Sequence, residues 1–329
     1  MDNKAEPELE VAAGDLEPLF SLVSGEGDGF LLGLAAGDAA GGAWDLGYSA
    51  ITEQATVIAY DLIQNRRIDT ESLRSALLEL AGSEGEDPVY RSETPTFRAW
   101  LAGAASGQVG HDPSLDGAAR STVIGVAFRK DPEAVVRETI TLGSMFDWDA
   151  TSIVVSLVAS TATAASCFAQ AGRDLIAGVR ETVVPAIELL EPDFTGIERL
   201  EGLGPRIESL IPVVGVAEAD EALDAVGGDP GDPLSAVLAA LLLSAPVNER
   251  FHVAVEQAAR IGGSPLGAFS GALIGARLGI KGWPWAFAND TWFAEIGRRL
   301  VRGPDQIEDL PIPYAVEHHL MYGPGRGFR

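Results

Sequence analysis

The sequence predicts a compact all-helical domain, and three observations support this fold class. Apolar residues recur at helical spacing from Gly29 onward. Alanine and leucine dominate these stretches, whereas the alternating β-branched pattern that is typical of strands is rare. Groups of Gly, Pro and Asp separate one apolar stretch from the next, and none is long enough to be an interdomain linker. With 329 residues, of which 47% are hydrophobic, the chain can bury a large core.

The two ends of the chain differ in composition from the part between them. Residues 1–28 are acidic, and we expect an N-terminal extension there. Residues 311–329 are rich in Pro and Gly, and we expect an irregular C-terminal tail. Residues 29–310 then form one helical domain. The acidic start lacks the basic residues and apolar core of a signal peptide, which favours a cytoplasmic location.

The charge of the chain excludes two classes of partner. Its formal net charge is -25, and no long Lys/Arg run interrupts this balance. An anionic surface repels phosphate backbones and anionic lipid, so we expect neither nucleic acid nor membrane as a partner. No uninterrupted apolar stretch reaches the roughly 18 residues of a membrane-spanning helix. The single cysteine, Cys167, lies in a small apolar run and is expected in the core.

The first predicted helix begins at Gly29 and is built from small residues. Glycines at 29, 33 and 37 share one helix face, which allows a second helix to approach closely. The helix is expected to stop at the turn formed by Gly37 and Asp38.

Later segments continue the helical pattern. Val, Ile and Thr gather in Ser152–Ala165, which alone is compatible with a strand, but the length of the run and its continuation through Ala, Ser and Gln favour a buried helix. Two helices are expected within residues 232–263, the second ending at Gly262–Gly263, and a Gly/Ala-rich helix follows over Gly267–Gly279. An amphipathic helix from Trp292 to Leu300 closes the domain.

These motifs identify a resemblance. The segment Gly37-Asp38-Ala39-Ala40-Gly41 resembles the Gly-Asp-Ala-x-Gly opening of ADP-ribosylglycohydrolases, and the later order of helix, acidic connector, helix ending in Gly-Gly, loop and Gly/Ala helix is similar to that family. Asp116–Ser121 looks like a degenerate form of the family's Asn-Gly-x-x-Met-Arg segment. The resemblance implies an orthogonal multi-helix bundle, an ADP-ribose substrate and two magnesium ions that activate water.

The metal motifs of the family are degraded in this chain. The first, Ser/Thr-Asp-Asp-Thr in the family, reads Thr52-Glu53-Gln54-Ala55 here. The last, Asp-x-Asp-Thr, follows Gly262–Gly263; one alignment places Ser264 and Leu266 at its aspartates, another Gly262 and Ser264, and both remove the two carboxylates. Loss of several charges weakens the binding of hard cations strongly. We therefore predict no dinuclear metal site and no other cofactor.

The resemblance nevertheless gives a set of candidate site residues. Four acids are candidates for catalysis, namely Glu53, Asp45, Asp147 and Asp149. The candidates for ligand binding are Asp38, Thr52, Gln54, Gly262, Gly263, Ser264, Trp44 and Trp148. The two tryptophans flank proposed site acids and could stack on a flat group such as adenine, although ordinary burial is the favoured explanation for both.

Two functional hypotheses follow. In the first, the protein is a catalytically degenerate binding or regulatory protein for a nucleotide, an ADP-ribose-like molecule, an ADP-ribosylated partner or another protein. In the second, remaining carboxylates such as Glu53, Asp45 and Asp147 or Asp149 form a metal-independent acid/base pair that cleaves a ribosyl bond. The missing metal ligands favour the first hypothesis.

Overall fold

The structure is a computed structural model that describes residues 29–42, 47–82, 88–91, 93–106, 115–169, 171–188, 202–229, 231–246, 251–279, 289–302 and 310–322. These residues form helices and contain no strand, which confirms the predicted all-α class. The helices are α2 (Phe30–Ala40), α3 (Ala50–Asn65), α4 (Thr70–Leu80), α5 (Pro95–Ala105), α6 (Asp116–Ala127), α7 (Pro132–Met145), α8 (Ala150–Ser166), α9 (Gly172–Glu188), α11 (Leu203–Leu210), the 3-10 turn Ile211–Val213, α12 (Ala219–Ala225), α13 (Pro233–Ser244), α14 (Phe251–Leu278), α15 (Asp290–Arg302) and α16 (Pro313–Tyr322).

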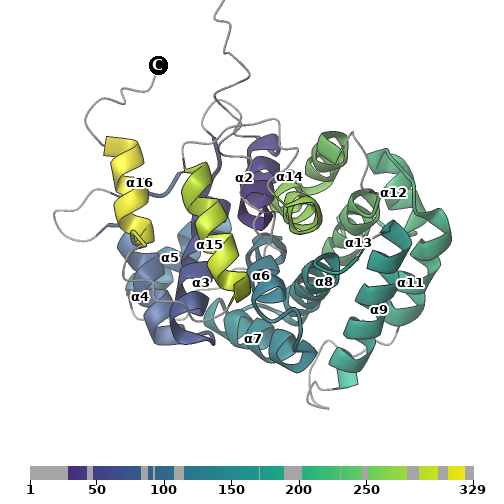
Figure 1. Cartoon of the computed structure of the whole chain (residues 1–329), viewed down its shortest axis with the longest axis horizontal. Helices are drawn as coiled ribbons and strands as arrows, with labels where there is room; N and C mark the ends of the chain where they lie inside the picture. Colours follow the sequence, from purple (N-terminus) through teal and green to yellow (C-terminus); the bar gives the residue numbers. More distant parts are fainter. Residues whose placement is uncertain are drawn as a thin grey trace, which may run out of the picture.

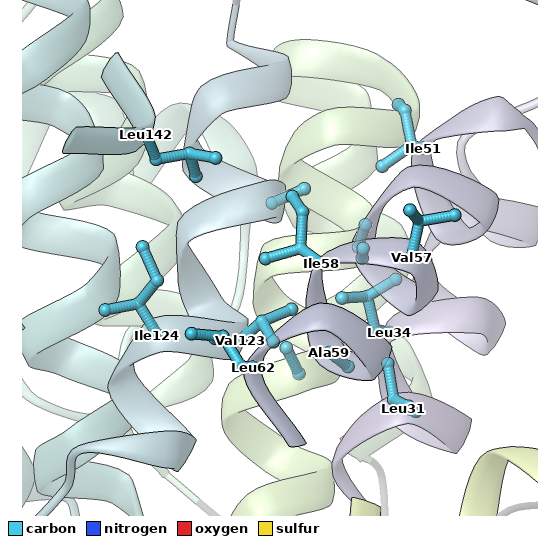
Figure 2. Close-up of a cluster of buried hydrophobic side chains, with 14 of the residues drawn as sticks. Leu31, Leu34, Ile51, Val57, Ile58, Ala59, Leu62, Val123, Ile124 and Leu142 are labelled. Atoms are coloured by element: carbon cyan, nitrogen blue, oxygen red, sulfur yellow. The ribbon is translucent and has the colours of Figure 1, made fainter. Parts of the chain in front are cut away.

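Two large hydrophobic clusters form the core, and both include residues from a central group of helices. Figure 1 shows α3, α4, α5, α15 and α16 on one side, α9, α11, α12 and α13 on the other, and α2, α6, α8 and α14 between them. One cluster joins α2 and α3 to α6 and α15; Figure 2 shows part of it, in which Leu31, Ile58 and Val123 come from three different helices. The second joins α8, α9, α13 and α14. Helix α14 serves both clusters, because Ala268 and Leu273 belong to different ones.

Glycines bring α2 and α14 into backbone contact. A Cβ atom placed at Gly37 would lie 1.9 Å from the carbonyl oxygen of Gly267, and one at Gly271 would lie 1.9 Å from that of Gly33. Only glycine permits such an approach. The predicted glycine face of the first helix is therefore confirmed. The predicted end is wrong, because α2 continues through Asp38 to Ala40 and leaves Asp38 buried in its last turn.

Capping side chains explain where several other helices begin. Their oxygens accept hydrogen bonds from backbone N–H groups of the first turn, which have no partner inside the helix. Pro occupies the first position of three of these helices, where its missing N–H costs nothing. The capping residues are Asp69 for α4, Thr94 for α5, Asp131 for α7, Asp149 for α8 and Asp232 for α13.

The structure confirms the helix predicted for Ser152–Ala165 and corrects the prediction for the C-terminal segment. Ser152–Ala165 lies within α8, so the choice of helix over strand is confirmed. The irregular tail expected for residues 311–329 is wrong in part, because α16 occupies Pro313–Tyr322. Pro313 supplies a favourable first helical position, and Glu317 anchors the helix in the interior, which the Pro/Gly content of the tail conceals. Residues 1–28 lie outside the described part of the chain.

No helix among the described residues is both long and apolar enough to cross a membrane.

A buried carboxyl in α3 makes the stability of the fold depend on pH. Asp61 accepts hydrogen bonds from Asn65 Nδ2 at 2.7 Å and from the backbone N–H of Asp69 at 3.4 Å. Burial raises the pKa of Asp61 from 3.8 to about 6 despite these bonds. The folded protein therefore holds this proton more tightly than the unfolded chain, and the associated stabilisation is complete below the unfolded pKa and lost as the pH rises through 6.

We expect Asp61→Asn to gain stability relative to the wild type between about pH 4 and pH 7, by at most about 3 kcal/mol, because the variant lacks the titrating group. Urea denaturation of both proteins over this range measures the difference. A difference that stays constant with pH would contradict the raised pKa.

Candidate functional site

Asp38 joins the last turn of α2 to the beginning of α3. Its carboxylate accepts hydrogen bonds from the backbone N–H and hydroxyl of Ser49 at 2.8 and 2.7 Å, and from those of Thr52 at 3.2 and 2.7 Å. Asp38 is fully buried; burial raises its pKa, and the hydrogen bonds from Ser49 and Thr52 oppose that shift. This cap fixes the orientation of the first turn of α3, which carries Glu53 and Gln54.

Glu53 shares a guanidinium group with a second glutamate. The backbone N–H of Arg91 donates to Glu53 Oε2 at 3.1 Å, and Arg91 Nε lies 3.6 Å from Glu53 Oε1. The Nη2 group of Arg91 donates to Glu317 Oε2 of α16 at 2.6 Å. Burial, followed by the negative charge of Glu317, raises the pKa of Glu53 well above its usual range. Two buried carboxyl groups that lie far apart in the sequence therefore compete for one cation.

Tyr48 and Asn289 complete this group. The Tyr48 hydroxyl donates to Glu317 Oε1 at 2.8 Å and accepts from Asn289 Nδ2 at 2.7 Å. The Arg91 guanidinium lies 4.3 Å from the centroid of the Tyr48 ring, whose other contact is an edge-on packing against Phe293 of α15. Residues 48, 53, 91, 289 and 317 thus form one network, which we call the Arg91 network; Tyr48, Glu53 and Glu317 are buried in it, and Arg91 and Asn289 are half-buried.

Gln54 contacts a second buried arginine. Arg120 of α6 donates from Nε to Gln54 Oε1, and its Nη2 lies 3.3 Å from Asp116 Oδ2. Asp116 also accepts from the Thr94 hydroxyl at 2.5 Å. The guanidinium lies 4.3 Å from the centroid of Phe146, and Arg120 has no exposed surface. The two positions after Thr52 are therefore each engaged by an arginine.

The kink in α14 lies beside the same end of α2. Gly262 and Gly263 leave the helical conformation, and Gly263 has a φ of 64°, which glycine adopts without strain. The Ser264 hydroxyl donates to the backbone carbonyl of Asp38 at 3.0 Å. A Cβ atom at Gly41 would lie 2.2 Å from Ser264 N, so glycine is required on α2 as well. The structure thus brings Gly263 and Ser264 next to the end of α2 that carries Asp38.

The turn between α7 and α8 holds three further candidates. Trp148 is buried and stacks on Phe146 with ring centroids 5.7 Å apart. Asp147 and Asp149 are exposed, and Asp149 accepts the backbone N–H of Ser152 at 2.7 Å as the cap of α8. These aspartates lie on a different element from Glu53, whose acidic neighbour is Glu317. Trp44 and Asp45 lie outside the described residues.

Metal-ligating side chains do not gather in the described part of the chain. No group of three or more His, Cys, Asp or Glu side chains there could hold a metal ion. At the position where the resemblance implies the first magnesium motif, the geometry instead supplies one carboxyl, one amide and two guanidinium groups.

A comparison with family models decides the relationship. The model for ADP-ribosylglycohydrolase matches residues 28–311. The chain belongs to the ADP-ribosylglycohydrolase family. A comparison with curated proteins finds no match. The match ends before α16, so Glu317 lies outside the residues that this family member shares with the family model.

Sequence reasoning missed most of the Arg91 network. Arg91 lies in a non-helical segment between α4 and α5, and Glu317 in the segment expected to be irregular. Their hydrogen bond joins residues 226 positions apart. The available signal was Pro313, which can begin a helix and so place Glu317 in a helical segment.

Proposed function

We propose that this family member is a catalytically degenerate binding protein, which recognises an ADP-ribose-like molecule or an ADP-ribosylated partner without a dinuclear magnesium centre. One observation carries the proposal: Arg91 and Arg120 engage Glu53 and Gln54, the residues at the aspartate positions of the first metal motif. Family membership supports the class of ligand.

The residues present do not fit a pair of magnesium ions. A magnesium site needs several anionic oxygens, whereas Gln54 offers an amide oxygen that already accepts from Arg120. Arg91 places a positive charge next to Glu53, the remaining carboxyl of the motif. The kink at Gly262, Gly263 and Ser264 adds no carboxylate. Like charges a few ångströms apart repel by several kcal/mol at the dielectric of a protein surface, so these guanidinium groups disfavour divalent cations.

Several features remain for recognition of a ligand. Backbone amides near Ser264, where the second half of α14 begins, favour an anionic group. Thr52 and Asp38 lie nearby, because the Ser264 hydroxyl donates to the backbone carbonyl of Asp38 and the Thr52 hydroxyl donates to its carboxylate. We assign Gly262, Gly263, Ser264 and Thr52 to ligand binding and Asp38 to the support of the site.

The proposal predicts binding of ADP-ribose that does not depend on a metal. Calorimetry with ADP-ribose should give the same dissociation constant in EDTA and in millimolar magnesium or manganese. A glycohydrolase assay on ADP-ribosylated protein should show no turnover in either condition. Turnover that requires magnesium, or tight binding of two magnesium ions in the absence of ligand, would overturn the proposal.

A second candidate function is favoured by one observation. Glu53 and Glu317 are two buried carboxyl groups held on one guanidinium, and a pair of carboxyl groups suffices for metal-independent cleavage of a glycosidic bond. This candidate predicts turnover in EDTA that Glu53→Gln abolishes while the fold is kept. If neither the wild type nor Glu53→Gln shows turnover, the result supports the binding protein instead.

A further inference from the structure

Helix α16 enters the candidate site from outside the residues that match the family model. The match ends at residue 311, and α16 begins at Pro313. Its Glu317 is nevertheless only 1% exposed and contacts Arg91 and Tyr48, which flank the first turn of α3. The site of this chain therefore contains a group that the shared domain does not supply.

Few of the described side chains of α16 are buried. Among residues 313–319, only Pro313 and Glu317 are buried, and Ala315 and His319 are exposed. Tyr314 packs partly against the core of the domain. Because this part of the helix buries so little apolar surface, we expect it to open locally at a lower free energy than the core helices. The bonds of Glu317 then contribute much of what holds α16 in place.

The groups that bind the Glu317 carboxylate are also suited to bind an anion from outside the protein. Arg91 Nη2 donates at 2.6 Å and the Tyr48 hydroxyl at 2.8 Å, so two donors converge on one singly charged group. Each phosphate of a pyrophosphate diester carries the same single charge and the same kind of acceptor oxygens. Arginine is suited to both carboxylate and phosphate.

We infer that α16 covers an anion-binding site and can detach from it. In the closed state the carboxylate of Glu317 takes the place of an anionic group of the ligand at Arg91 and Tyr48. The ligand class is a singly charged carboxylate or phosphate, and the pyrophosphate of an ADP-ribose-like molecule is the case that rests on the proposed function. The ligand then binds only to molecules in which α16 is detached. The apparent affinity is the intrinsic affinity multiplied by the fraction of such molecules.

Hydrogen exchange and calorimetry on the full chain test this inference. Glu317→Gln removes the charge of the side chain but keeps its size, so the α16 amides should exchange about tenfold faster or more, and ADP-ribose should bind tighter by a similar factor. His319→Gln, an exposed change on the same helix, should leave both quantities at their wild-type values. If Glu317→Gln folds poorly, Tyr48→Phe is the second variant: it removes one donor to Glu317 and keeps the ring, so the α16 amides should again exchange faster, but ADP-ribose should not bind tighter, because the lost hydroxyl is also a donor to the ligand.

The outcomes separate the cover from the proposed function. Added ADP-ribose should accelerate α16 exchange in the wild type, because ligand and helix compete. Slower exchange with ligand, or equal affinity of the wild type and Glu317→Gln, would overturn the cover. If α16 exchanges faster in Glu317→Gln but no variant binds ADP-ribose, α16 is detachable and the proposed ligand is wrong. In that case inorganic pyrophosphate and citrate, used as probes in the same titration, should bind Glu317→Gln more tightly than the wild type.

Discussion

Alanine at Gly271 should destabilise the protein by about 3 kcal/mol or more, because the new methyl group has no space. Its Cβ would lie 1.9 Å from the carbonyl oxygen of Gly33, and the nearest atoms belong to the backbone of α2 rather than to a side chain that can rotate away. Relief would require α2 and α14 to separate. That movement would also shift the Asp38 cap and the kink at Gly263.

Urea denaturation of Gly271→Ala and of a matched control measures this effect. Gly202→Ala is the control, because a Cβ atom at Gly202 meets no atom within 4 Å and its φ is -88°. We expect the control to change the free energy of unfolding by less than about 1 kcal/mol. If the two variants are equally stable, α2 and α14 do not have the backbone contact described above.

Methionine at Arg120 should destabilise the protein by about 3–5 kcal/mol, because it leaves buried polar groups without their partner. Asp116 would lose its cation, and Gln54 would lose the donor to its oxygen. The flat contact with the Phe146 ring would also disappear. Arg120→Lys keeps the charge but not the planar group, and its loss of stability should be intermediate.

The control for Arg120 is an arginine in an exposed ion pair. Arg98 is 69% exposed at its side chain and pairs with Glu93, so Arg98→Met should cost about 1 kcal/mol or less. Thermal and urea denaturation of both variants give the comparison. A double variant, Arg120→Met with Asp116→Asn, should recover part of the lost stability, since the second change removes the buried negative charge that Arg120 balances. Equal stability of the two single variants would mean that Arg120 does not hold the site together.

The sequence predicts the helices better than it predicts their side-chain contacts, and the reason is physical. The glycine face of α2 and the apolar pattern of α8 are local, repeating signals, and both are found in the structure. Thr52 and Ser264 each bond to Asp38, and all three residues belong to motifs that carry the family resemblance. The Arg91 network has neither kind of signal, because single charged residues far apart in sequence form it.

The same limit applies to the residues proposed for catalysis. An acidic chain offers many carboxyl groups, and sequence spacing does not distinguish a cap from a site acid. Asp149 binds the first turn of α8, whereas Glu317, in a segment expected to be irregular, is buried beside Glu53. Burial and the partner of each carboxyl decide its role, and both depend on tertiary packing.

The carboxylate and the backbone carbonyl of Asp38 hold different helices in place. Its carboxylate holds the start of α3, and its backbone carbonyl holds Ser264 at the α14 kink. Three helices therefore meet at one residue. Neither of these contacts uses the side chain of Glu53 or Gln54, so substitutions at those two positions can alter the chemistry of the site while the junction between the helices persists.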